Sequence, residues 1–141
     1  MIEREPQRHI GYLIRRAQQL HVATWARIVS TEISSPQYTI LVILDQRGSA
    51  SQRELGDEVD LDRSTIADLV ARMERRGLLR RDRDPDDARR KTVTLTEHGR
   101  AERVRLRPLV EQVQRELVAP LSDQAHAGLR HALHGMLDLD D

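Results

Sequence analysis

Residues 51–77, SQRELGDEVDLDRSTIADLVARMERRG, predict two helices joined by a short turn. The first helix begins at a capping box, because Ser51 and Glu54 are spaced so that each side chain can accept a hydrogen bond from the other's backbone N–H. Asp62 is the expected N-cap of the second helix, and Gly77 ends that helix in a left-handed conformation. The stretch therefore predicts a helix-turn-helix.

The second of these helices has one apolar face and one polar face. Its apolar stripe, which we expect to pack on the core, consists of Ile66, Leu69, Val70 and Met73. The second helix of a helix-turn-helix fits the major groove of DNA. We therefore expect its outward side chains to contact phosphates or base edges, and these are Arg63, Ser64, Thr65, Asp68 and Arg72.

Residues 78–83 and 91–95 predict two paired strands, and the sequence between them, DPDDARR, predicts a turn. Such a hairpin is a wing, whose tip reaches the minor groove beside the recognition helix. An arginine there gains from the strong negative potential of a narrow minor groove. We therefore predict DNA contacts from Arg89, Arg90 and Lys91. The alternative is a hairpin that serves only as scaffold, which gives no reason for arginines at its tip.

The order and spacing of short motifs in this segment resemble the MarR family of bacterial winged-helix regulators. The matching pieces are QRELG (52–56), LDRSTI (61–66), RGLL (76–79), DPDDARR (84–90), VTLT (93–96) and Gly99. The resemblance implies a homodimer that binds a pseudo-palindromic operator, usually as a repressor released by a small ligand. It also implies that Arg89 is the minor-groove arginine and that Asp87 orients it through a charge-assisted hydrogen bond.

Four further helices are expected outside this segment. They cover about residues 8–29, 36–47, 97–118 and 123–137. Ser35 is the expected cap of the second, and Pro108 is expected to kink the third. The fold class is thus mainly α with a small β-wing, in the order α-α-α-α-β-β-α-α, with one small strand before Ser51. We expect a single domain over residues 1–141, with the winged helix-turn-helix at residues 36–98.

The outer helices carry more apolar side chains than one small winged helix can cover. Excess apolar stripes on terminal helices favour a partner chain. Two-fold symmetry also suits a protein that reads paired half-sites, since the spacing of the recognition helices must match the DNA turn. We therefore predict a homodimer formed by residues 8–30 and 100–138. A purely intramolecular bundle is the alternative.

Composition narrows the class of protein. The formal net charge of zero argues against indiscriminate binding of polyanions, and the lack of cysteine excludes a thiol-based sensor. A cysteine nucleophile, a glycine-rich phosphate loop and paired catalytic acids are all missing from the sequence, so we expect no enzyme and no cofactor. The sequence holds neither a signal peptide nor a long apolar run, so we expect a cytoplasmic protein without a membrane partner.

The first helix places polar and aromatic side chains together. At 100° per residue, Arg15, Gln18 and Trp25 project to one side, with His21 at its edge. A guanidinium binds a carboxylate bidentately, an imidazole can hydrogen-bond a carboxylate or a ring hydroxyl, and an indole can stack. These groups suit an aromatic carboxylate. The alternative is structural: Arg15 pairs with acids across the dimer, while His21 and Trp25 belong to the core.

A second resemblance supports this ligand class. The run 13–25 together with SSPQY (34–38) is similar to MarR-family regulators of aromatic-acid breakdown, above all those that respond to protocatechuate and similar hydroxybenzoates. The resemblance implies a ligand between the dimer helices and the winged helix. It implies that Arg15 holds the carboxylate and that His21 is a second contact, and we add Tyr38 to the candidate ligand residues.

The histidines near the C-terminus allow a metal hypothesis. His131 and His134 lie three residues apart on the last predicted helix, with His126 nearby. A metal site needs more ligands than two histidines, and the neighbouring Arg130 disfavours a cation. We therefore interpret these histidines as part of a solvated helix face and predict no metal.

Taken as a sequence, the chain predicts a dimeric DNA-binding transcriptional regulator, most simply a repressor, that a small aromatic carboxylate releases from its operator. Its partners would be double-stranded DNA, a second copy of itself and the effector. The alternative is a ligand-independent DNA-binding module, controlled by a protein partner or by its own abundance.

Overall fold

A computed structural model of the chain describes residues 2, 4–87 and 89–139, so five positions of the predicted 1–141 domain, including Ala88 in the wing motif, lie outside the described residues. The chain order is η1 (Glu5–Arg8), α1 (Ile10–Ile28), α2 (Ser35–Arg47), β1 (Ala50–Ser51), α3 (Gln52–Val59), α4 (Arg63–Arg75), β2 (Leu79–Arg83), β3 (Lys91–Leu95), α5 (Glu97–Val118) and α6 (Asp123–Met136).

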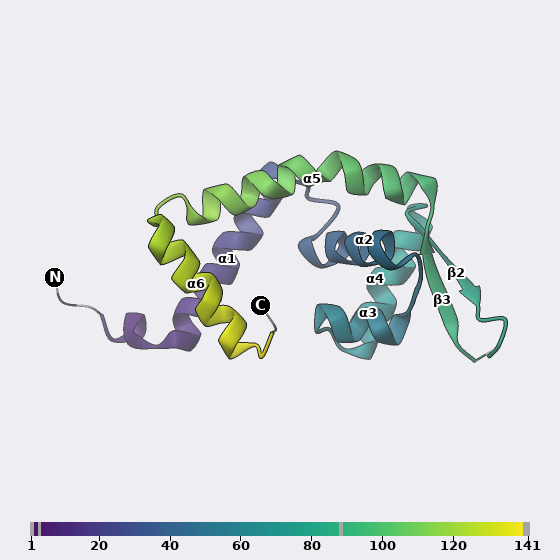
Figure 1. Cartoon of the computed structure of the whole chain (residues 1–141), viewed down its shortest axis with the longest axis horizontal. Coiled ribbons are helices and arrows are strands. Elements are labelled where there is room, and N and C mark those ends of the chain that lie inside the picture. Colours follow the sequence, from purple (N-terminus) through teal and green to yellow (C-terminus); the bar gives the residue numbers. More distant parts are fainter. Residues whose placement is uncertain (1, 3, 88, 140–141) are drawn as a thin grey trace.

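The elements form two groups that the long helix α5 connects (Figure 1). One group holds α1 and α6, and the other holds α2, α3, α4 and the sheet. Helix α5 packs against α1 and also against α2, so it spans both groups. Pro108, where we expected a kink, lies inside α5, and the helix continues through it.

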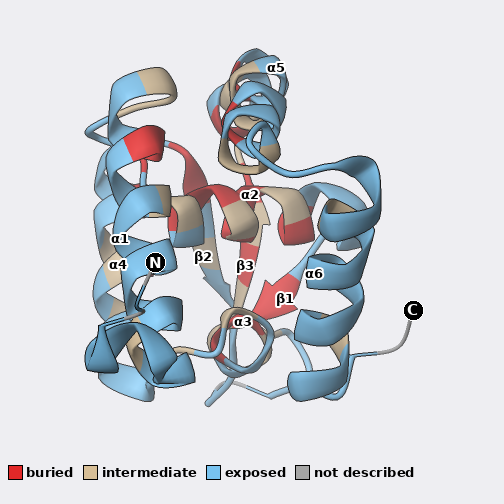
Figure 2. Ribbon diagram, turned by 90° about the vertical axis from the view of Figure 1, so that its left-hand side faces the viewer, coloured by how far each residue is buried: buried red, intermediate tan, exposed pale blue. Residues whose placement is uncertain are grey.

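The core lies almost entirely in the second group. Figure 2 shows buried positions gathered on α2, the sheet and the inner side of α5. The most enclosed apolar side chains are Ile33, Ile40, Leu41, Leu44, Leu55, Val70, Met73, Leu78, Leu79, Val93 and Leu106. In contrast, α6 buries none of its described residues and α1 buries only Thr24 and Trp25. The apolar stripes of α1 and α6 are therefore left largely in solvent.

The sheet has three antiparallel strands in the order β1-β3-β2. Strands β2 and β3 pair from Leu79 opposite Leu95 to Arg83 opposite Lys91, and β1 adds the small strand that the sequence predicts. Gly99 lets α5 start directly against this sheet, because a Cβ there would lie 1.9 Å from the Leu78 carbonyl oxygen. The resulting winged helix-turn-helix is the predicted fold class.

Two helix starts differ from the expectation. Ser34, and not Ser35, caps α2: its hydroxyl accepts from Gln37 N at 3.3 Å, and Gln37 Oε1 accepts from Ser34 N at 3.0 Å. Ser34 is favoured because a glutamine stands three residues after it and completes a reciprocal box. At Ser51 only half of the predicted box forms. Its hydroxyl accepts from Glu54 N but donates to the Glu54 carboxylate, both at 3.1 Å.

Candidate nucleic-acid interface and effector site

The start of α4 is organised by Asp62. Its carboxylate accepts from Thr65 N at 2.8 Å, from Ser64 Oγ at 2.8 Å and from Thr65 Oγ1 at 2.9 Å. These bonds, the one from the Thr65 backbone first, hold the pKa of Asp62 below its usual value. Since both hydroxyl hydrogens point to Asp62, the hydroxyls offer lone pairs to a partner. That arrangement suits a base amino group better than a phosphate, which needs a donor.

The rest of the outward face of α4 is in solvent. Arg63 is exposed at the first helical position, and Asp68 pairs with Arg72 one turn later at 3.2 Å. Both side chains of that pair are more than half exposed, so the pair contributes little to stability. All five predicted residues of α4 are therefore exposed, and Arg63 is the one of the five that also lines the cleft beside the wing.

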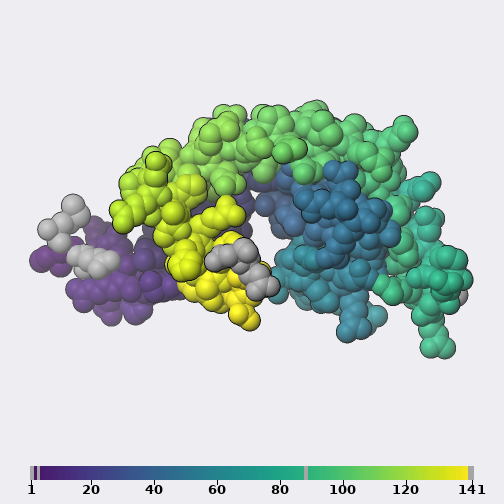
Figure 3. Space-filling model, viewed as in Figure 1, coloured from purple at the N-terminus to yellow at the C-terminus, as the bar shows by residue number. Residues whose placement is uncertain are grey.

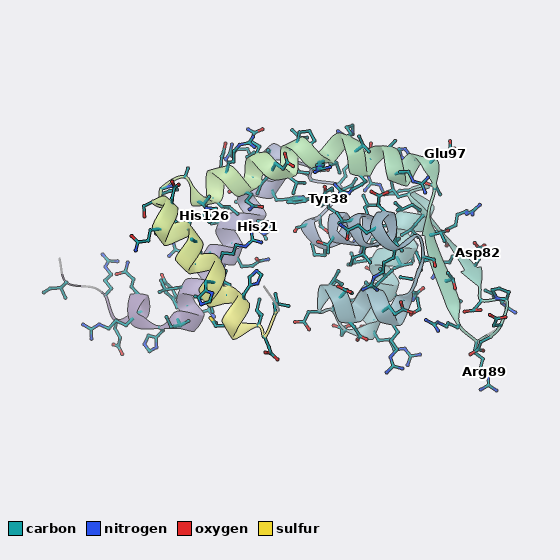
Figure 4. All side chains as sticks on the ribbon, in the orientation of Figure 1. His21, Tyr38, Asp82, Arg89, Glu97 and His126 are labelled. Atoms are coloured by element: carbon teal, nitrogen blue, oxygen red, sulfur yellow. The ribbon has the colours of Figure 1, made fainter. Side chains whose placement is uncertain are left out.

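Asp87 orders the tip of the wing through the backbone. Its carboxylate accepts from Arg89 N at 3.0 Å, and Asp84 accepts in the same way from Asp86 N at 2.8 Å. The bond from Arg89 N to Asp87 forms an Asx turn, which a two-residue spacing favours, and the orienting role that the resemblance implies for Asp87 stays a prediction. Arg89 extends from the tip of the hairpin, away from the rest of the protein (Figure 4).

Arg90 turns back from the wing towards α3. Its guanidinium forms an ion pair with Glu54, and Arg47 from α2 lies 3.8 Å from the same carboxylate and also pairs with Glu58. The hydrogen bond from the Ser51 hydroxyl, helped by Arg90, lowers the pKa of Glu54. Sequence reasoning assigned Arg90 to DNA and Glu54 only to a helix cap. The hairpin brings them together across 36 residues, which local spacing could not reveal.

A cleft of about 930 Å³ separates the wing from α3 and the start of α4. We call it the wing cleft. Five cationic residues line it against two acidic residues: Arg53, Arg63, Arg89, Arg90 and Lys91 against Glu54 and Asp57. On a chain with no net charge, this is a local positive surface of the kind that phosphates attract.

The candidate ligand residues fall into two sets. His21, Trp25 and Tyr38 form a row of rings, with centroids 6.0 Å apart from His21 to Trp25 and 5.9 Å apart from Trp25 to Tyr38. Arg15 and Gln18 are exposed nearer the start of α1, and Arg15 lines a shallow surface hollow beside η1. Six residues of helix place Arg15 about 9 Å along the axis from His21.

The row of rings is mostly enclosed. Trp25 is 5% exposed and its Nε1 donates to the Ile33 carbonyl oxygen at 2.7 Å, while Tyr38 is 7% exposed. Trp25 therefore has no free N–H to offer a ligand, and packing is its main role in this chain. His21 is half-buried, and burial lowers its pKa, so the imidazole is neutral at pH 7.

Two of these rings, His21 and Tyr38, lie near the hollow beneath α5. Figure 3 shows an opening between the group of α1 and α6 and the winged helix, and Figure 4 shows His21 and Tyr38 on facing elements near it. The hydroxyl of Tyr38 accepts from Arg103 Nη1 at 2.5 Å. Sequence reasoning missed Arg103. The available signal was its spacing of three and seven residues from Leu106 and Val110, which places it on the inward stripe of α5.

The histidines of α6 do not form a metal centre in the described part of the chain. His126 and His134 are half-buried and His131 is exposed. Among the described residues, no group of three or more potential ligands lies close enough to hold a metal ion.

None of the described helices is both long and apolar enough to span a bilayer.

Comparison with known proteins decides the family. Residues 33–91 match the MarR family. The HTH-type transcriptional repressor NicR of Pseudomonas putida is 30% identical over 133 residues, covering 94% of this chain and 84% of NicR. The chain belongs to the MarR family. This MarR-family protein is accordingly a transcriptional regulator and not an enzyme, as the sequence predicted.

Solved MarR-family structures share the fold over nearly the whole chain. The PcaV regulator of Streptomyces coelicolor, solved with its natural ligand, is 38% identical, with a TM-score of 0.90 and coverage of 98% of both chains. BpsR of Bordetella bronchiseptica, whose DNA binding is regulated by 6-hydroxynicotinic acid, is 29% identical, with a TM-score of 0.84 and coverage of 90% of this chain and 97% of BpsR. The predicted winged-helix fold is confirmed.

Proposed function

We propose that this MarR-family regulator is a repressor that binds a pseudo-palindromic operator as a homodimer and that a small aromatic carboxylate releases it. The observation that carries the DNA-binding part is the wing cleft, where cationic side chains from α3, α4 and the wing converge on one surface. This surface combines a helix that fits a major groove with a hairpin tip that fits the adjacent minor groove.

On this surface the residues have different tasks. The outward side chains of α4 face the major groove: Arg63, Ser64, Thr65, Asp68 and Arg72. Arg89 enters the minor groove from the tip, which Asp87 shapes through its backbone bond. Arg90 and Lys91 line the cleft, and Arg90 can exchange its pairing with Glu54 for a phosphate.

The homodimer is proposed from the exposed apolar stripes. In helices near the two ends of the chain, the structure leaves in solvent Ile10, Leu13, Ile14, Leu20, Val104, Leu129, Leu133 and Met136. Apolar surface of this extent favours association, and two-fold pairing through residues 8–30 and 100–138 would cover it. The pairing would also set the spacing of the two copies of α4 to a helical repeat of DNA.

The effector class is proposed from the polar and aromatic groups of α1 and α2 and from the relatives. BpsR responds to 6-hydroxynicotinic acid, an aromatic carboxylate, and PcaV was solved with a natural ligand. In this chain Arg15 would take the carboxylate, with Gln18 beside it and His21 as a neutral hydrogen-bonding group. Tyr38 would contact the ring and Trp25 would support it. The acid can release the protein from its operator only if it binds the conformation that does not bind DNA more tightly than the conformation that does.

A single titration tests both parts. Wild-type protein selects its operator from a random duplex library, and anisotropy then measures affinity for that duplex with and without hydroxybenzoates, cinnamates and 6-hydroxynicotinate. We expect sequence-specific binding by a dimer that at least one acid weakens, and loss of this response in Arg15→Ala. Absence of specific binding would contradict the DNA-binding part. Specific binding that no acid alters would favour the ligand-independent module.

A further inference from the structure

Arg103 is the most enclosed cation of the long helix that joins the two groups of elements. Only 15% of its side chain is exposed, although α5 is otherwise rich in exposed arginines. It lies beside the core residue Leu106, where burial of a charge is costly unless the charge is paired. Arg103 therefore does not belong to the solvent-exposed face of α5, and its burial calls for a structural or functional explanation.

Among the described residues, the polar contacts of Arg103 come from α2. Nη1 donates to Tyr38 Oη at 2.5 Å, and the guanidinium carbon lies 5.4 Å from the centre of the Tyr38 ring. Nε is buried without a hydrogen-bond partner and lies 3.7 Å from Asp45 Oδ2, beyond normal hydrogen-bond length. The guanidinium thus lies between the two ends of α2, with Nη1 hydrogen-bonded at the Tyr38 end and Nε without a hydrogen bond at the Asp45 end.

The Tyr38 end of this arrangement belongs to the proposed effector site. Tyr38 packs on Trp25, which packs on His21, so the row of rings from α1 ends at the Arg103 guanidinium. A ligand that shifts the Tyr38 ring must therefore also move or release Nη1 of Arg103.

The Asp45 end belongs to the winged helix. Asp45 stands in the last turn of α2, and two residues later Arg47 pairs with Glu58 and approaches Glu54 on α3. Glu54 in turn pairs with Arg90 of the wing. The C-terminal end of α2 is therefore linked to both elements that line the wing cleft.

We infer that Arg103 couples effector binding to operator binding, by exchanging its contact with Tyr38 for a closer contact with Asp45. The inference rests on the proposed function, because it assumes an effector beside Tyr38. Arg103 acts as a positioning residue: it touches neither DNA nor effector, and it sets where α2 lies relative to α5. The feature with two arrangements is the guanidinium, whose Nη1 is held by Tyr38 while its unpartnered Nε lies 3.7 Å from Asp45.

The test measures coupling as the ratio of operator dissociation constants with and without saturating protocatechuate. The operator is the duplex selected by wild type, and protocatechuate binding is followed by fluorescence of Trp25, the single tryptophan of the chain. Effectors change partner affinity by about 5- to 150-fold in typical cases. In Arg103→Gln we expect operator and protocatechuate affinities each within about threefold of wild type, but a coupling ratio below about three.

Two further variants separate coupling from simple structural support. Arg107→Gln is the matched control, because Arg107 lies one turn further along α5 and, in the described part of the chain, forms its ion pair within that helix, with Glu111 at 3.4 Å. It should keep the wild-type ratio. Arg103→Lys keeps a charge beside Asp45 without the second arm for Tyr38, so an intermediate ratio is expected.

Each outcome decides the matter. A wild-type ratio in Arg103→Gln, or an equal loss in Arg107→Gln, overturns the inference and leaves the proposed effector intact. A wild type whose operator affinity no aromatic acid alters overturns the effector proposal and the coupling with it. If Arg103→Gln does not fold, Asp45→Asn tests the same contact from α2, and an unchanged ratio there also overturns the inference.

Discussion

Gly99→Ala tests how closely α5 must approach the sheet. The Cβ of an alanine would lie 1.9 Å from the Leu78 carbonyl oxygen and 3.2 Å from the Leu95 side chain. The Leu78 oxygen belongs to the backbone and accepts a hydrogen bond from Thr96 N at 3.2 Å. Moving it away from the new Cβ would therefore weaken the bond that ties the residue before β2 to the N-cap of α5. Helix propensity alone would favour alanine by at most about 1 kcal/mol.

Steric conflict in a packed site costs about 1–3 kcal/mol, and more where backbone must move. We therefore expect Gly99→Ala to lower the free energy of unfolding by about 2 kcal/mol or more, which corresponds to a fall in Tm of roughly 5 °C for a chain of this size. Chemical denaturation at fixed protein concentration measures the change, because a dimer would make stability depend on concentration.

Ala101→Gly is the matched control for that experiment. Ala101 is exposed two residues further along α5, so the reverse substitution reports helix propensity without a clash. It should cost no more than about 1 kcal/mol. If Gly99→Ala is as stable as wild type or more stable, the close approach of α5 to Leu78 does not exist in the protein.

Three other changes probe the wing, a helix start and a half-buried histidine. Arg89→Ala should weaken operator binding by about 1–3 kcal/mol while circular dichroism and Tm stay unchanged; equal affinity at fixed salt would remove Arg89 from the interface. Ser34→Ala should cost about 1 kcal/mol in unfolding free energy, whereas Ser35→Ala should cost little; the opposite ranking would restore Ser35 as the cap. Burial lowers the pKa of His21 from 6.5, so the unfolded chain binds more protons at this site and stability falls as pH drops below about 6.5. His21→Gln should make the free energy of unfolding depend less on pH below about 6.5, and an unaltered pH dependence would show that burial does not affect His21.

Much of the fold was predictable because local signals agreed with each other. Ser51, Asp62 and Thr96 are side-chain caps in the structure, and Gly48 and Gly77 have the positive φ values expected at helix ends. Caps and turns depend on residues within four positions, so a linear sequence contains them completely. The cap of α2 was misplaced by one residue because two serines precede the proline and only one has a glutamine at the right spacing.

The candidate sites were less predictable, because they depend on contacts between distant segments. Sequence reasoning placed Arg90 on DNA, and the structure pairs it with Glu54. It predicted a charge-assisted hydrogen bond between Asp87 and Arg89, and only the structure shows that the backbone N–H of Arg89 donates to that carboxylate. The family motifs identified which residues gather at the wing, but ion pairs across 36 residues follow from the angle of the hairpin.

The sequence by itself determined the helix-turn-helix, the wing, the small strand before Ser51 and the lack of thiol chemistry, since each follows from periodicity, caps or composition. Only the tertiary structure decided that Trp25 is enclosed with its N–H taken by Ile33, and that Arg103 reaches Tyr38 across 65 residues. The physical reason is that burial and side-chain partners depend on how helices pack, and α5 brings α1 and α2 together only once the chain has folded.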